Sequence, residues 1–311
     1  MRAPVNRREL LGAIYAPALA WSVGCRTSLK ADALDRVASL ASTPGTAENL
    51  ASDEDFWFPI QEAFTADRSM VNLNNGGICP SPASVQEAMK RYLDHANTAP
   101  AYVLWRLQDP QKETVRTGLA RLFGCDREEI AITRNASESL ENVQMGLDLK
   151  AGDEVLTTTQ DYPRMLTTWK QRARRNGIVL REIQVPLACQ DPAEIVRRFE
   201  SGISEKTRVI HMCHVINITG QVMPVKAVVS MARPKGIAVV VDGAHSFAHL
   251  DFKHADLDCD YFGTSLHKFL FAPHGTGMLY VRRDKIRGLW PEPEGLGSDR
   301  LYLLQLGVEL A

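Results

Sequence analysis

The chain has 311 residues, 45% of them hydrophobic and 23% charged, which is the composition of an ordinary globular protein. That length is ample for one large domain and part of a second. A formal net charge of −1 gives no reason to expect nucleic acid or an anionic membrane surface as a partner. The six cysteines include no Cys-x-x-Cys pair, so the sequence indicates neither a zinc knuckle nor a disulfide framework.

Residues 1–25 are predicted to be an export signal. The segment Asn6–Leu11 (NRRELL) resembles a twin-arginine signal, and the apolar run behind it ends at Val23, too short to span a bilayer comfortably. We therefore expect a bacterial protein in the periplasm or outside the cell. Ala18–Ala20 is a candidate cleavage site. In one alternative Cys25 carries a lipid anchor, and in another the segment is an ordinary amphipathic helix.

Residues 26–70 are polar and are predicted to be a linker that ends in a short packing segment around Phe56–Pro59. Beyond them, amphipathic helices alternate with β-branched apolar strands. The expected helices are 82–97, 109–123, 136–149, 163–176, 192–201 and 225–233. The expected strands are 130–133, 154–159, 179–185, 209–215, 237–241, 261–263 and 277–281. This alternation predicts an α/β fold over residues 71–290, a three-layer αβα sandwich around a mostly parallel sheet.

In such sheets ligands bind beyond the carboxyl ends of the strands, so the polar residues at those ends are candidates for a site. Asn135 follows the first strand and can cap the next helix in a capping box with Glu138. The free N–H groups of that helix, including the one of Ala136, and the Ser137 hydroxyl can form a phosphate cup. A helix cap without a ligand is the alternative.

Two further strand ends carry an aromatic and an amide side chain. Tyr162 can lie flat on a cofactor ring, or be a half-buried loop residue. Asn217 can donate to a phenolate oxygen, or form a local turn. The cluster Asn72–Gly77 has amides that can reach a ligand, or is a plain loop.

Asp242 and Lys268 are the most informative pair. Asp242 ends a continuous apolar strand, where an unpaired carboxylate is costly, and His245 follows within one turn. Lys268 lies among apolar residues, directly behind Ser265 and His267. A lysine Schiff base, an acid on a ring nitrogen, and a hydroxyl and an imidazole at a phosphate would together hold an aromatic, phosphorylated aldehyde cofactor.

These strand ends resemble the motifs of the class V aminotransferase family, pyridoxal 5′-phosphate (PLP) enzymes that include cysteine desulfurases, kynureninases and isopenicillin N epimerases. Residues 135–138 (NASE) resemble its Gly-Ala-Thr-Glu phosphate motif, and residues 214–220 (HVINITG) its His-x-x-Asn-x-x-Gly motif. Residues 242–245 (DGAH) resemble its Asp-Ala/Gly-Ala-Gln/His motif, and residues 265–268 (SLHK) its Ser-x-His-Lys motif. The twin-arginine start and LNNG at 73–76 resemble the isopenicillin-N-epimerase-like branch most closely.

The resemblance implies the large domain of PLP transferase fold type I, an amino-acid substrate that undergoes transamination or epimerisation, and a homodimer with its site at the interface. Lys268 would form the Schiff base and then transfer protons, and Asp242 would keep the pyridine nitrogen protonated. The other cofactor-binding residues would be Asn135, Ala136, Ser137, Ser265 and His267 at the phosphate, Tyr162 on the ring, and Asn217 and His245 beside the ring oxygen.

The family continues into a small C-terminal domain that supplies the arginine for the substrate carboxylate. Here residues 291–311 are expected to be the start of such a domain, most of it missing. A cofactor-binding but inactive relic of the family is therefore one alternative. Another is a metal-dependent hydrolase, which leaves the phosphate cup and the SLHK motif unexplained. Its ligands would come from His211, His214, Asp242, His245, His249 and His254.

Overall fold

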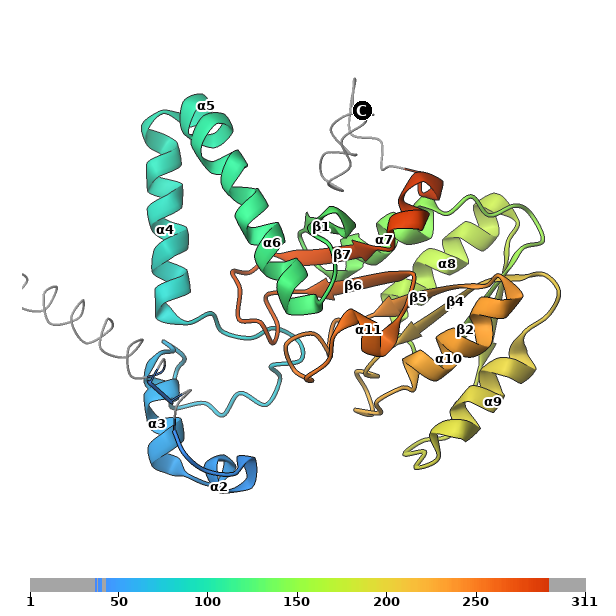
Figure 1. Ribbon diagram of the computed structural model, residues 1–311, viewed down its shortest axis with the longest axis horizontal. Coiled ribbons are helices and arrows are strands. Elements are labelled where there is room, and N and C mark those ends of the chain that lie inside the picture. The colour runs from blue at the N-terminus through green and yellow to red at the C-terminus, as the bar shows by residue number, and fades with distance from the viewer. Residues whose placement is uncertain (1–36, 38, 41–42, 291–311) are drawn as a thin grey trace, which may run out of the picture. The chain divides into compact units, whose positions relative to one another are not determined.

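The computed structural model describes residues 37, 39–40 and 43–290 (Figure 1). The predicted export signal, Cys25 and residues 291–311 lie outside the described residues, so these expectations stay predictions. Within the described residues, those up to 71 form one compact unit with 80–93, and residues 72–79 form a second unit with 94–290. The second unit carries the sheet and is the larger one.

The first unit contains helices where the composition suggested a linker. Helix α2 spans Ala47–Ala51 and α3 spans Glu54–Glu62, and the Asp53 side chain caps α3 by accepting two backbone N–H groups. Helix α4, Ala83–Thr98, begins here. Residues 80–93 thus group with this unit, although the sequence placed them in a single domain from 71 to 290.

The second unit is built on a seven-stranded sheet in the order β1-β7-β6-β5-β4-β2-β3. Strand β7 is antiparallel to both neighbours, β1 and β6, and the other pairings are parallel. The strands are β1 Ile130–Thr133, β2 Glu154–Thr158, β3 Val179–Ile183, β4 Thr207–Cys213, β5 Ala238–Asp242, β6 Tyr261–Ser265 and β7 Gly277–Val281. The predicted mostly parallel sheet is confirmed.

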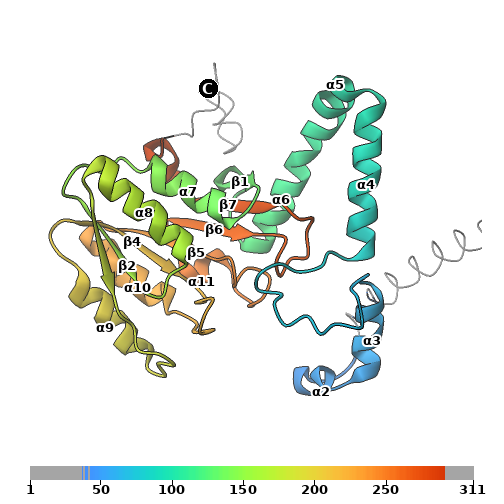
Figure 2. The ribbon, with the colours of Figure 1, turned by 180° about the vertical axis from the view of Figure 1, so that it is seen from behind.

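Helices cover both faces of the sheet (Figure 1 and Figure 2). Helices α7 (Ala136–Gly146) and α8 (Pro163–Asn176) bury Leu140 and Trp169 against one face. On the other face, α6 (Lys112–Phe123), α9 (Pro192–Gly202) and α10 (Val225–Ala232) share a second core that includes the fully buried Phe199. Short α11 spans His254–Leu257. The three predicted layers are therefore present.

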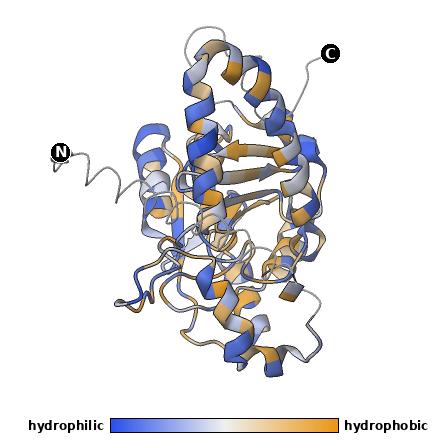
Figure 3. Ribbon diagram, turned by 90° about the vertical axis from the view of Figure 1, so that its left-hand side faces the viewer, coloured by the Kyte–Doolittle hydropathy of each residue, from blue (hydrophilic) through white to orange (hydrophobic). Residues whose placement is uncertain are grey.

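Hydropathy follows the layers. Figure 3 shows mainly hydrophobic strands, whereas the helices alternate between hydrophobic and hydrophilic residues. In β5, Val239 and Val241 pack into one core and Val240 into the other, because successive strand side chains point to opposite faces. None of the helices in the described ranges has the length and apolar character needed to cross a bilayer.

The ends of helices agree with the sequence prediction where a single residue type determines them. Gly124 and Gly177 end α6 and α8 with φ of +81° and +71°, as a left-handed C-cap requires. The predicted helix from residue 109 instead begins as α-helix at Lys112. Short α5 (Pro100–Tyr102), a π-helical turn at 103–108 and a 3₁₀ turn at 109–111 precede it, since Pro110 has no N–H to donate.

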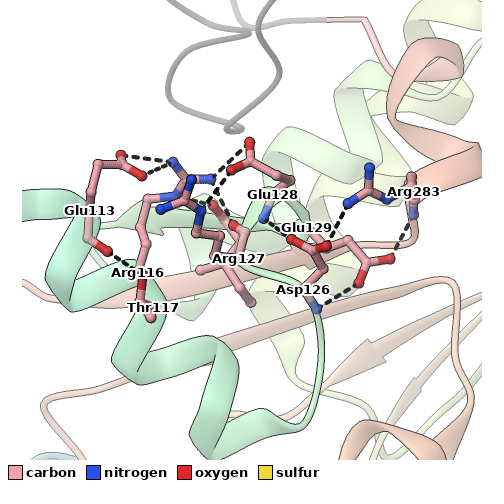
Figure 4. A network of polar contacts seen from close by, with 9 residues as sticks. Glu113, Arg116, Thr117, Asp126, Arg127, Glu128, Glu129 and Arg283 are labelled. Carbon is pink, nitrogen blue, oxygen red and sulfur yellow. Dashed lines mark hydrogen bonds and ion pairs between the residues drawn. The ribbon is translucent and has the colours of Figure 1, made fainter.

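A buried arginine fixes the start of the sheet (Figure 4). Arg116 on α6 is 5% exposed, and its guanidinium donates to the carbonyls of Ile130 at 2.9 Å and Arg127 at 2.7 Å. Both Glu113 carboxylate oxygens accept from it at 2.8 Å. Arg116 thereby joins α6 to the segment that enters β1, the strand directly before the Asn135 cap.

Replacing Arg116 with alanine is expected to lower the free energy of unfolding by about 2–4 kcal/mol, because the buried Ile130 carbonyl and the partly buried Arg127 carbonyl lose their donor. Urea denaturation measures the loss. Arg283 in the same view pairs with Asp126 at the surface, at 2.7 Å, so Arg283→Ala is the matched control with a change below about 1 kcal/mol. Equal losses for the two variants would contradict this account.

Candidate active site

A single pocket collects every residue that the sequence singled out as a cofactor or catalytic residue. It has a volume of about 290 Å³ and lies at the carboxyl edge of the sheet. The predicted residues that line it are Asn135, Ala136, Ser137, Tyr162, Asn217, Asp242, His245, Ser265, His267 and Lys268. They come from five strand ends, which the parallel topology brings to one edge.

The start of α7 forms one wall of the pocket. Asn135 caps the helix, because its Oδ1 accepts the N–H of Glu138 at 2.8 Å. The Ala136 N–H donates to the Ser265 hydroxyl at 2.9 Å, which joins α7 to the end of β6. The predicted capping box is wrong in one respect: the Glu138 carboxylate accepts the N–H of Arg134 rather than that of Asn135.

A glycine on β7 makes room for this wall. A Cβ at Gly277 would lie 2.6 Å from the Asn135 nitrogen, so any larger residue would push the α7 terminus away from the sheet. The resulting concave arrangement of backbone N–H groups and hydroxyls suits a phosphate group.

Asp242 lies at the base of the pocket, at the end of β5. Its side chain is 5% exposed, and its Oδ1 accepts the N–H of Ala244 at 2.9 Å. Burial raises the pKa of this carboxyl to about 6, against the opposing effects of the Ala244 hydrogen bond and the Lys268 charge. A cationic ring nitrogen beside the carboxylate would compensate the charge that burial disfavours.

Lys268 follows β6 and lies in the same pocket. Burial lowers the pKa of its amine, and the negative charge of Asp242 acts in the opposite direction. No carboxylate of the described residues is within ion-pair distance of its Nζ. The amine is therefore closer to its neutral, nucleophilic form than a lysine in water.

Two histidines in the pocket are neutral near pH 7. Burial lowers the pKa of His245 to about 4. Gly76 packs closely on this ring, since a Cβ at Gly76 would lie 2.9 Å from its Cε1. Burial also lowers the pKa of His267, whose Nδ1 donates to the Thr276 carbonyl at 2.9 Å. A carbonyl can only accept, so this bond places the His267 proton on Nδ1.

Asp161 is a supporting residue that sequence reasoning missed. It is 2% exposed; its Oδ1 accepts the Cys213 N–H at 2.6 Å, and its Oδ2 accepts the Thr157 hydroxyl at 2.7 Å and the Thr158 N–H at 2.8 Å. It therefore joins the ends of β2 and β4 and holds Tyr162, the next residue, at the pocket. The sequence signal that could have revealed this role is an acid that directly follows the threonines at the end of β2.

The six side chains considered for a metal site do not all converge, although Asp242 and His245 line the same pocket. His211 is fully buried with its ring 6.2 Å from that of Trp169, and the His214 ring lies 4.9 Å from that of Phe252. No group of three or more His, Cys, Asp or Glu side chains in the described ranges is placed to hold a metal ion. The described residues thus do not support the ligand set of a metal-dependent hydrolase.

Comparisons with known proteins identify the family of the chain. The family model described as aminotransferase class-V matches residues 71–305. Isopenicillin N epimerase from Streptomyces clavuligerus is 32% identical over 249 residues, which cover 78% of this chain and 63% of that protein. A probable cysteine desulfurase from Aeropyrum pernix is 34% identical over 251 residues, covering 78% of this chain and 59% of that protein.

Solved structures add the fold and the cofactor. A lysine-to-alanine variant of C-DES with glycine covalently linked to its PLP cofactor matches with a TM-score of 0.68 at 26% identity, over 75% of this chain and 62% of that one. The chain spans about three fifths of the length of the curated relatives it matches. The α7 wall, the buried carboxyl and the lysine fit PLP. The chain belongs to the class V aminotransferase family, with the large-domain fold of PLP enzymes of fold type I and PLP as the family's cofactor.

Proposed function

We propose that the protein is a PLP-dependent enzyme that acts on the α-carbon of an amino acid, by transamination or epimerisation. The observation that carries the proposal is the convergence of Lys268, the buried Asp242 and the α7 wall on one pocket. The likeness to isopenicillin N epimerases and to cysteine desulfurases supports chemistry at the α-carbon.

Each part of bound PLP would be held by a different group of these pocket residues. The Ala136 N–H and the Asn135, Ser137, Ser265 and His267 side chains would hold the phosphate. Tyr162 would lie on the ring, and Asn217 and His245 would flank the ring oxygen. Asp242 holds the proton of the pyridine nitrogen, because a carboxylate in so buried a place is stabilised by a cationic partner.

Lys268 is the proposed residue that transfers the α-proton of the substrate. PLP, when bound, supplies an electron sink that stabilises negative charge at the α-carbon. The lowered pKa of Lys268 lets Nζ accept a proton from that carbon near neutral pH and return it. The neutral His245 and His267 do not add positive charge beside the amine.

The direct test is to load the purified full chain with PLP and reduce it with borohydride. Peptide mass spectrometry should find a pyridoxyl group on Lys268. A panel of amino acids then separates the reactions, since transamination yields a keto acid and the amine form of the cofactor, whereas epimerisation yields the opposite enantiomer. A protein that acquires no pyridoxyl group at Lys268 is not this enzyme.

Ser265→Ala is expected to weaken PLP binding by about 10- to 100-fold, because a hydrogen bond to the charged phosphate is lost. The Ala136 N–H also loses its present acceptor. Fluorescence titration of the apoprotein gives the dissociation constant. Ser246 is buried and does not line the pocket, so Ser246→Ala is the matched control, with unchanged affinity. Unchanged PLP affinity in Ser265→Ala would contradict the predicted phosphate contact.

We also propose that two copies of the chain form the homodimer expected for this family. The region from α5 into the π-helical turn exposes large apolar side chains, with Tyr102 61%, Leu104 42% and Trp105 70% exposed. Contiguous apolar exposure of this kind marks an interface. We propose that this surface packs against the same surface of a second copy of the chain.

Trp105→Glu is expected to shift the protein from dimer to monomer, because it places a charge in an apolar contact. Light scattering coupled to size exclusion, at micromolar concentration, measures the mass. Leu187→Glu alters an equally exposed apolar residue in the loop after β3, and this variant should stay dimeric. A monomeric wild type, or identical masses for the two variants, would sink this proposal.

A further inference from the structure

Arg164 lines the pocket as a positive charge that nothing in the described structure neutralises. It is the second residue of α8, two positions behind Tyr162, and is exposed. No hydrogen bond or ion pair joins its guanidinium to any residue within the described ranges. Arg172 on the same helix differs, since it is buried and donates to the Gln144 carbonyl at 2.6 Å. A guanidinium stays charged at any physiological pH, so Arg164 is free to bind an anion.

The register of two helices places Arg164 beside Ser137. Helices α7 and α8 run side by side in the same direction, since each leads back from the carboxyl edge of the sheet (Figure 2). Thr168 donates to Glu141 at 3.4 Å, and the Arg172 contact repeats the pairing one turn further on. One turn earlier, the same register puts Arg164 beside Ser137. Both residues line the pocket.

The α7 wall needs a positive charge to hold a phosphate. The donors proposed for the phosphate are the Ala136 N–H, the Asn135 amide, the Ser137 and Ser265 hydroxyls and His267, and all of these are neutral near pH 7. Burial lowers the pKa of His267, and the Nδ1 proton of this ring is already donated to the Thr276 carbonyl. A doubly charged phosphate in a partly enclosed pocket is held best by a donor that is itself charged.

We propose that Arg164 completes the phosphate site, with its guanidinium bound to the phosphate oxygens of PLP next to Ser137. The inference rests on the proposed function, because the phosphate belongs to the cofactor. The planar fork of N–H donors suits two phosphate oxygens at once. Arg164 lies outside the motifs through which the sequence resembles the family, at 73–76, 135–138, 214–220, 242–245 and 265–268.

The test compares two ligands that differ only in the phosphate. The dissociation constants of PLP and of pyridoxal are measured for the apoprotein of the full chain and of Arg164→Gln. The variant is expected to bind PLP about 10- to 100-fold more weakly and pyridoxal with unchanged affinity. Arg164→Lys keeps the charge but not the fork, and is expected to fall between the two.

Arg174→Gln is the control for the loss of a charge from α8, because Arg174 is exposed on the same helix and does not line the pocket. It should bind PLP as the wild type does. Unchanged PLP affinity in Arg164→Gln overturns the inference, and so does an equal loss for PLP and pyridoxal. A variant that binds PLP normally but an amino-acid substrate weakly would assign Arg164 to the substrate carboxylate instead, and would likewise overturn it.

Inorganic phosphate separates this inference from the proposed function. If the wild type binds neither PLP nor pyridoxal, the proposed function fails. Calorimetric titration of the apoprotein with inorganic phosphate then decides the inference alone: binding by the wild type that is lost in Arg164→Gln and kept in Arg174→Gln supports it. Equal phosphate binding by all three proteins overturns it.

Discussion

Replacing Lys268 with alanine is expected to abolish borohydride-reducible attachment of PLP and to lower turnover by about 10²–10⁴-fold, the usual contribution of a positioned general base. The physical reason is specific to this amine. It lies in the pocket without a carboxylate partner among the described residues, and burial lowers its pKa. Peptide mass spectrometry after reduction, and a product assay on the active amino acid, measure the two losses.

The matched control is Lys235→Ala. Lys235 is exposed and precedes β5, at the opposite edge of the sheet from the pocket. It should retain both the attached cofactor and turnover. With both proteins free of PLP, the Lys268 variant should also unfold no earlier than the wild type, because the change removes a charge that burial already disfavours. A pyridoxyl group that remains attached in Lys268→Ala would show that another amine carries the cofactor.

The sheet could be predicted from sequence because its signals are local. Continuous β-branched runs such as Val239–Val241 are typical of strands buried on both faces, and glycines such as Gly124 and Gly177 are typical of helix ends, where both adopt a positive φ. The strand ends therefore fell within a few residues of the predicted positions. The order of the strands could not be read in the same way, because pairing joins segments far apart in the chain, as in β1 with β7.

The site was predictable in its contents but not in its contacts. Asp242 and Lys268 stood out because a charged side chain among apolar neighbours needs a partner. The hydrogen bond from Ala136 to Ser265 spans 129 positions, so no local pattern predicts it. Arg164 was overlooked for a related reason: its place beside the phosphate wall follows from the register between α7 and α8, which only the packed structure reveals.

Asp242→Asn is expected to make the apoprotein more stable at pH 8 by up to about 3 kcal/mol while disabling the enzyme. Burial raises the folded-state pKa of this carboxyl from its ordinary 3.8 to about 6. Below pH 3.8 the folded and the unfolded chain both hold the proton, and the group contributes nothing. Between pH 3.8 and 6 only the unfolded chain releases it, so stability falls as the pH rises. Above about pH 6 the loss is complete.

The measurement is urea denaturation of both apoproteins at pH 4 and pH 8. The difference between the variant and the wild type should grow from near zero at the lower pH to its full value at the higher one. His214 and His245, whose pKa burial lowers to about 4, destabilise both proteins alike in acid, so their effect cancels in the difference. A difference that does not change with pH would contradict a buried, ionised Asp242.

Asp242→Asn should no longer be favourable once PLP is bound. Asparagine keeps the shape of the side chain and can still accept the Ala244 N–H, but it has no charge with which to hold a proton on the pyridine nitrogen. Turnover should therefore fall by at least about 10²-fold, as when one preorganised electrostatic group is removed from an active site.

The added stability from PLP, measured as the shift in unfolding midpoint on loading, should also be smaller than in the wild type. An Asp242→Asn enzyme with normal turnover would mean that the carboxyl is buried for structure alone. A residue that destabilises the empty protein and is compensated only by the bound ligand is expected where the residue is kept for catalysis.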